Sequence, residues 1–107
     1  MTEFTARKGR SPSHLHVSLS SAFNADAWKE FEDFYREQIR AGCIHWDLDL
    51  CQVTFFNNVM LGMLVGLNTI LTTREGSLRI VVRSKSPLSQ LFSLSRIDRI
   101  MSVNEVS

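Results

Sequence analysis

The sequence is poor in several features that would point to particular classes of protein. Only two of its 107 residues are cysteine, and two are proline. The longest apolar stretch, residues 59–67, is nine residues long and includes two glycines, whereas a helix needs about 20 residues to cross a bilayer. The N-terminus is polar and lacks the apolar segment of a signal peptide, and the formal charge is only +1. We therefore expect a cytoplasmic protein that inserts no segment into a membrane and is not a strong polyelectrolyte.

The two cysteines flank a predicted strand. Along an extended chain, at about 3.3 Å per residue, Cys43 and Cys51 would lie about 25 Å apart, far beyond the reach of a disulfide. Neither has a neighbouring histidine or basic cluster in the sequence that would activate a thiolate. We expect two reduced thiols without a catalytic role.

The alternation of predicted strands and helices indicates the fold class. Apolar residues make up 44% of the chain, which suits one domain over residues 1–107 with a modest core. Alternating apolar and polar residues predict strands at 14–19, 44–50 and 78–83, a short edge strand at 4–8, and a final element of undefined type at 97–103. Apolar residues at three- and four-residue spacing predict helices over residues 24–41, 58–75 and 86–94. This order predicts an α/β fold with largely parallel strands and right-handed crossovers.

The chain is organised around residues 49–71, which combine the end of a buried strand, a loop and a helix. From Asn58 onward, the apolar residues recur on one helical face: Met60, Met63, Leu64, Leu67, Ile70 and Leu71. Asparagine is a favoured N-cap, because its side-chain oxygen accepts a hydrogen bond from a backbone N–H group of the first turn. Asn57 and Asn58 should therefore lie at the exposed, electropositive end of a helix that packs on the sheet.

Two groups of polar side chains are candidates for chemistry. The first shares one side of a strand and contains metal-ligand types: His45, Asp47 and Asp49. The second is a short basic arm: Arg7, Lys8, Arg10, His14 and His16. The first group has no further ligand at a characteristic spacing, and the second lacks the interleaved aromatic residues of a nucleic-acid-binding segment. With no phosphate-binding glycine motif either, we predict no metal or other cofactor, no nucleic-acid partner and no enzymatic activity.

The segment from Asp49 to Gly62, DLCQVTFFNNVMLG, resembles the signature of STAS domains, the family of anti-sigma factor antagonists and sulfate-transporter tails. That signature is roughly D-L-s-x-V-x-f-i-D-S-s-G-l-g, followed by an apolar helix. Residues 76–81, GSLRIV, are similar to the family's G-x-L-x-L-v strand, and residues 88–100, ending IDRI, to its closing l-x-x-L-x-L-s-g-L-D-x-l segment. Residues 19–24, LSSAFN, match L-x-G-x-L-D less well.

This resemblance covers about residues 13–103 and implies a STAS-like fold. In such a fold, a central mixed, mostly parallel sheet of about four to five strands has helices packed mainly on one side. It also implies a non-enzymatic regulatory module that binds a protein partner, with an anti-sigma-type kinase as the expected partner. The alternative is a cytoplasmic accessory subunit of a membrane transporter, for example of a lipid-type ABC transporter complex. A homodimer is also left open.

Three asparagines depart from the family pattern. Asn58 occupies the position of the Ser or Thr that is phosphorylated in the signalling members, and Asn57 and Asn24 stand where the family has acids. An amide cannot accept a phosphoryl group, so Asn58 is a degenerate phosphosite. Two interpretations stay open: drift in a domain that no longer signals, or a permanently unphosphorylated form, which in the family is the form that binds the kinase. The partner-binding surface is predicted at Asn24, Asn57, Asn58, Val59 and Leu61.

Overall fold

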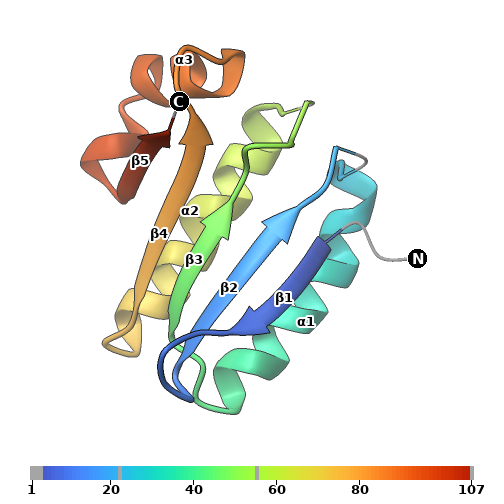
Figure 1. Ribbon diagram of the computed structural model, residues 1–107, viewed down its shortest axis with the longest axis vertical. Coiled ribbons are helices and arrows are strands. Elements are labelled where there is room, and N and C mark those ends of the chain that lie inside the picture. Colours follow the sequence, from blue (N-terminus) through green and yellow to red (C-terminus); the bar gives the residue numbers. More distant parts are fainter. Residues whose placement is uncertain (1–3, 22, 55, 107) are drawn as a thin grey trace.

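The computed structural model describes residues 4–21, 23–54 and 56–106 and shows a mixed sheet with helices on one face (Figure 1). The strands in this part of the chain are β1 (Phe4–Lys8), β2 (His14–Leu19), β3 (His45–Asp49), β4 (Ser77–Arg83) and β5 (Ser102–Val106). They lie in the order β1-β2-β3-β4-β5, and each neighbouring pair is parallel except β1 and β2. The predicted α/β fold with a mixed, mostly parallel sheet is confirmed. Ala22 and Phe55, which belong to two of the family-like segments, lie outside the described residues.

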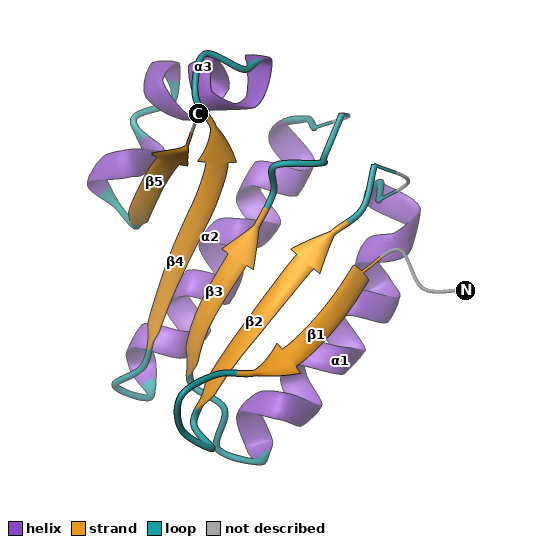
Figure 2. Cartoon of the chain, viewed as in Figure 1, coloured by secondary structure: helices purple, strands orange, loops and turns teal. Residues whose placement is uncertain are grey.

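The helices connect neighbouring parallel strands and explain why one face of the sheet is covered. Within the described ranges they are α1 (Trp28–Arg40), α2 (Asn58–Thr73) and α3 (Pro87–Leu94), with short 3-10 turns η1 (Ala25–Ala27) and η2 (Ile97–Arg99). Strands are added to the sheet in one direction from β2 to β5. Right-handed crossovers then place successive helices on the same face, and α1 and α2 both lie behind the sheet in Figure 2.

No helix in the described ranges has both the length and the apolar character needed to span a membrane.

The core between the helices and the sheet has an aromatic half and an aliphatic half. Beneath α1, the ring of Phe31 packs edge-on against Trp28, Tyr35 and Trp46, with centroid separations of 5.2, 5.6 and 6.2 Å. Beneath α2, the fully buried side chains are aliphatic: Met60, Leu64, Leu67 and Leu71 from the helix, and Leu48, Ile80 and Val82 from the sheet. These buried stripes are the three- and four-residue patterns that predicted the helices.

Two glycines follow the first two long helices. Gly42 comes after α1 with a φ of 100°, a left-handed conformation that glycine adopts without a steric penalty. Gly76 comes after α2, and a Cβ atom there would overlap the carbonyl oxygen of Ile44. That oxygen accepts a hydrogen bond of 2.9 Å from the backbone N–H of Ser77. The absence of a side chain at residue 76 therefore lets the start of β4 pair with the start of β3.

The C-terminal part differs most from the prediction. Residues 97–103 were predicted as one element but divide between η2 and the start of β5. Leu94 is 83% exposed, because α3 ends at this residue and buries Leu88, Ser89 and Phe92. The helical segment predicted from Asn24 begins as the 3-10 turn η1 and becomes α-helical only at Trp28.

Candidate protein-binding site

The two asparagines at the start of α2 have different roles. Asn57 has extended backbone angles, and its Oδ1 atom accepts a hydrogen bond of 2.9 Å from the backbone N–H of Met60. It is therefore the N-cap of α2. Asn58 is the first helical residue, and its exposed side chain has no hydrogen-bond partner in the described part of the chain. The prediction that the helix begins at this pair is confirmed, and the amide available to a partner is that of Asn58.

The first turn of α2 has an uncompensated positive partial charge. It carries no acidic side chain, although the free N–H groups at the start of a helix favour a neighbouring negative charge. Among the described residues, no acceptor contacts the backbone N–H group of Asn58 or Val59. This end of the helix is thus suited to hydrogen-bond acceptors supplied from outside the chain.

Apolar surface lies beside these polar groups. Val59 is 60% exposed, which is uncommon for an aliphatic side chain in this protein, whereas Leu61 is half-buried and packs against the core. A polar helix end next to an exposed aliphatic side chain is a typical composition for a small protein-binding surface.

Asn24 lies on the neighbouring connection. Its Oδ1 atom accepts hydrogen bonds from the backbone N–H groups of Asp26 at 2.9 Å and Ala27 at 3.2 Å, so it caps η1. The connections that follow β2 and β3 emerge at the same end of the sheet (Figure 1), and the Thr54 hydroxyl donates to the carbonyl oxygen of Ser21 at 3.4 Å. The structure therefore places Asn24 on the same edge as the start of α2. Whether a partner contacts these residues stays a prediction.

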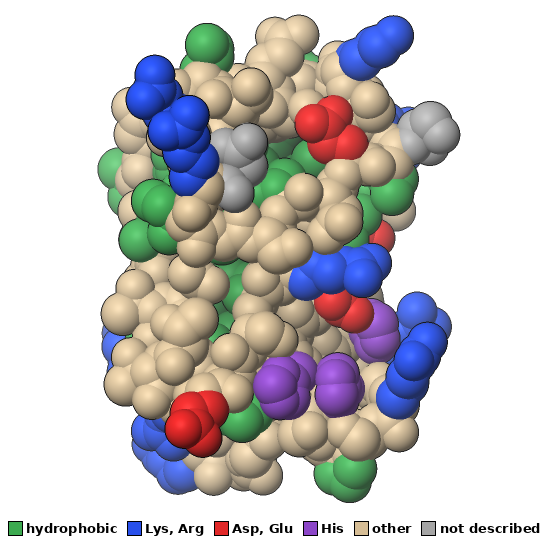
Figure 3. Space-filling model, turned by 90° about the vertical axis from the view of Figure 1, so that its left-hand side faces the viewer, with side chains coloured by type: hydrophobic (Ala, Val, Ile, Leu, Met, Phe, Trp, Pro, Cys, Tyr) green, Lys and Arg blue, Asp and Glu red, His purple; other side chains and the backbone are tan. Residues whose placement is uncertain are grey.

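The open face of the sheet gathers the polar residues that were candidates for chemistry. Asp47 accepts from His16 Nδ1 at 3.2 Å and lies 3.6 Å from Arg79 Nε, while His45 stacks on His14 with ring centroids 5.0 Å apart. The histidines appear together on this side of the molecule in Figure 3, with cationic and acidic side chains next to them. In the described residues, no three histidine, cysteine or acidic side chains come close enough to hold a metal ion. The paired charges form a solvated surface.

The basic arm is divided by the strand pairing. Arg7 faces His16 across β1 and β2 on the open side, whereas Lys8 turns toward the helix side and donates from Nζ to the Sγ atom of Cys43 at 2.9 Å. The sequence shows no histidine or basic cluster beside either cysteine, but the fold brings one lysine to Cys43 and places Arg83 near Cys51. The contact of Lys8 is formed between an edge strand and the residue after α1, so it was not visible as a local sequence pattern. Both cysteines are free, as predicted.

A cavity that was not predicted from the sequence lies next to the start of α2. It lies at the carboxyl ends of β3 and β4 and includes Cys51 and Arg83 in its walls. Burial raises the pKa of the Cys51 thiol, and the hydrogen bond and charge of Asp49 raise it further. The only signal for this cavity in the sequence was the apolar loop after β3, and this loop alone does not indicate that it encloses a space with the end of β4 and with α3.

Comparison with protein families matches residues 6–103 to the family described as "Mlab, STAS domain". Since the match spans most of the chain, the protein belongs to the STAS domain family, and its α/β architecture is the STAS fold. The chain is also similar to the NMR structure of the protein TM1081, with a TM-score of 0.74, 16% sequence identity, and coverage of 99% of this chain and 82% of that chain. At such low identity, this similarity concerns the fold alone. A search of curated proteins finds no match.

Proposed function

We propose that this STAS domain is a non-enzymatic regulatory module that binds a protein partner through the start of α2. The observation that carries the proposal is the exposed amide of Asn58, which has no partner among the residues that the structure describes, at a helix end whose first turn has no acidic side chain. STAS domains are generally non-catalytic, and this family membership supports a binding role.

The same residue defines the regulatory character of the proposed module. Asn58 stands where signalling members of the family carry a phosphorylatable hydroxyl, and it presents a neutral amide instead. The proposed site is therefore permanently in the unphosphorylated form, and binding is controlled by the abundance or state of the partner. An anti-sigma-type kinase is the partner class that we propose first, and a subunit of a membrane transporter is the alternative.

Site-specific photo-crosslinking tests the proposal. A photoreactive residue is introduced at Val59 and, as a matched control, at Thr69, which is exposed further along the same helix. In cells of the source organism, we expect the probe at residue 59, but not that at residue 69, to form a covalent adduct with one protein. Mass spectrometry of the adduct then separates a kinase from a transporter subunit. Equal labelling from both positions, or none from residue 59, would contradict the proposed surface.

A further inference from the structure

The cavity at the carboxyl ends of β3 and β4 has a volume of about 380 Å³. This lies within the range of about 300–1,000 Å³ that is usual for small-molecule sites. Its walls come from the loop between β3 and α2, from the end of β4 and from α3: Leu50, Cys51, Val53, Thr54, Phe56, Arg83, Ser86, Pro87, Leu88 and Leu91. In α/β sheets, ligands are commonly bound outside the carboxyl ends of the strands.

The cavity walls are mainly apolar and are held in place by the core. Leu50 and Leu88 are buried, and the ring of Phe56 packs edge-on against Phe92 at a centroid separation of 5.6 Å. Leu91 is half-buried and packs against the same core cluster. These walls offer an apolar ligand a surface that is already ordered, so little conformational entropy is lost on binding.

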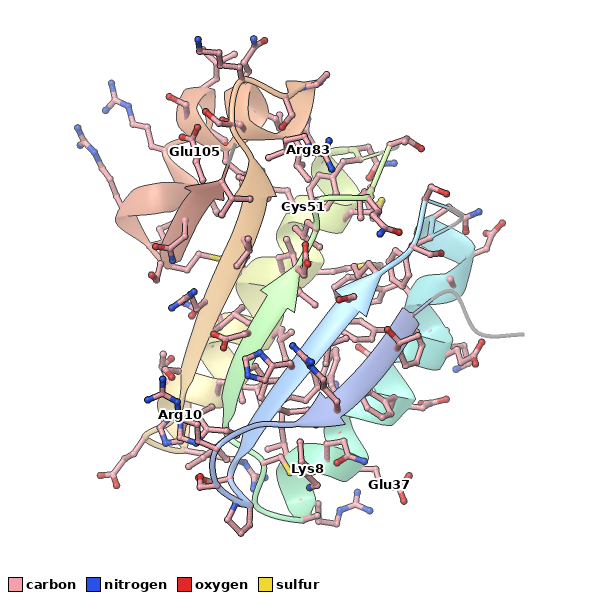
Figure 4. The ribbon with its side chains drawn as sticks, viewed as in Figure 1. Lys8, Arg10, Glu37, Cys51, Arg83 and Glu105 are labelled. Atoms are coloured by element: carbon pink, nitrogen blue, oxygen red, sulfur yellow. The ribbon has the colours of Figure 1, made fainter. Side chains whose placement is uncertain are left out.

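One cation lies at this cavity without a counter-ion. Arg83 is exposed at the end of β4, and within the described residues its guanidinium group forms no ion pair and no hydrogen bond. By contrast, Arg79, on the same strand, lies next to the carboxylate of Asp47. The nearby carboxylate of Asp49 accepts from the backbone N–H of Cys51 at 2.8 Å. Figure 4 shows Arg83 and Cys51 at the same end of the sheet.

We propose that this cavity binds a single-chain amphiphile with an anionic head, for which a medium-length fatty acid is the simplest example. The acyl chain lies against the apolar walls, and the carboxylate binds the guanidinium group of Arg83. A neutral apolar molecule would leave this cation unpaired, and a small polar anion would leave the apolar walls in contact with water. The apolar walls and Arg83, which is the one cation among the described residues that line the cavity, together favour a ligand that has both parts. None of the residues proposed for protein binding is among those that form the cavity walls, so this proposal does not depend on the proposed function.

Binding of hexanoate, octanoate and decanoate, below their micelle-forming concentrations, tests the proposal by calorimetry. Each added methylene should tighten binding about fourfold until the cavity is filled. Arg83→Gln should weaken decanoate binding about fivefold, because it removes a charge-assisted hydrogen bond at a partly exposed position. Arg79→Gln is the matched control on the same strand and should leave the affinity unchanged. Decanol, which lacks the charge, should bind both variants and the parent protein equally.

The two cysteines provide an independent readout. Cys51 is half-exposed in the cavity wall, whereas Cys43 is buried and serves as an internal control. Decanoate should slow alkylation of Cys51 by iodoacetamide in the parent protein, and should do so less at the same concentration in the Arg83→Gln variant. Rates are compared with and without decanoate within each variant, because the charge of Arg83 also affects the thiol. The proposal is overturned if decanoate does not bind, if Arg83→Gln and Arg79→Gln have the same effect, or if Cys51 is not protected.

Discussion

The side chain of Asn57 accepts a hydrogen bond from the backbone N–H of Met60, and this contact separates folding from recognition at the start of α2. Loss of an N-cap typically costs about 1 kcal/mol. We therefore expect Asn57→Ala to lower the free energy of unfolding by about 1 kcal/mol in urea denaturation. Asn58→Ala, the matched control one residue further, should change it by less than about 0.5 kcal/mol, as for other exposed positions. Equal losses in the two variants would show that Asn57 is not the main cap.

The second prediction concerns recognition by Asn58. A carboxylate at this position suits the helix dipole and should cause no loss of stability, but it would repel acceptors that a partner directs at the free N–H groups. We predict that Asn58→Asp leaves the melting temperature nearly unchanged and weakens binding of the crosslinked partner at least tenfold, or about 1.4 kcal/mol. Asn58→Ser, which stays small and neutral, should bind with the affinity of the parent. Calorimetry with the purified partner measures both variants, and parental affinity of the Asp variant would favour drift at this position.

The two glycines at residues 66 and 76 should respond in opposite directions to the same substitution. A Cβ atom at Gly76 would overlap the carbonyl oxygen of Ile44, whereas one at Gly66 has no heavy atom within 4 Å. Gly76→Ala should therefore destabilise the protein by about 2 kcal/mol, as expected for overpacking against backbone. Gly66→Ala lies within α2 and should stabilise it by about 0.5–1 kcal/mol through helix propensity. Urea denaturation of both variants checks the signs, and a destabilised Gly66→Ala variant would contradict the open space seen there.

Ionisation of Tyr35 should lower the free energy of unfolding at alkaline pH. Burial raises its pKa to about 12, and the charge of Glu32 also raises it. In the unfolded chain a tyrosine ionises near pH 10, so the folded state prefers the neutral phenol. The contribution of this group is complete below about pH 10 and is lost as the pH rises toward about 12.

This dependence can be measured directly, because the chain contains a single tyrosine. Phenolate absorbance of the folded protein should appear only at a pH well above that of the unfolded chain in urea. Tyr35→Phe should flatten the fall in unfolding free energy over this range relative to the parent protein. An absorbance midpoint near pH 10 in the folded protein would refute the expected shift.

The fold was predictable to the extent that each element buries one face. Alternation in β2, β3 and β4 and the apolar stripes of α1 and α2 arise directly from contact with a single core. The edge strand β5 lacks that signal, because residues 102–106 are mostly exposed or half-exposed. The asparagine cap of α2 was also predictable, since it is a local interaction between neighbouring residues.

The remaining features depend on residues that are far apart in the sequence. The contact between Lys8 and Cys43 requires β1 to pair with β2 and α1 to return to the sheet. The cavity at Arg83 requires two loops from different crossovers to lie next to each other. Such features are set by the three-dimensional packing of elements, and local periodicity carries no information about them.

The division of the core into aromatic and aliphatic halves determines what optical methods can detect. Both tryptophans of the chain lie in the aromatic half of the core: Trp28 is the first residue of α1, and Trp46 lies on β3. Tryptophan fluorescence therefore reports on the environment of α1, while the packing of α2 contributes no tryptophan signal. Circular dichroism at far-ultraviolet wavelengths detects both helices. If the α2 half opens at a lower urea concentration than the rest, the dichroism transition will precede the fluorescence transition, and coincident transitions will show that the two halves unfold as one cooperative unit.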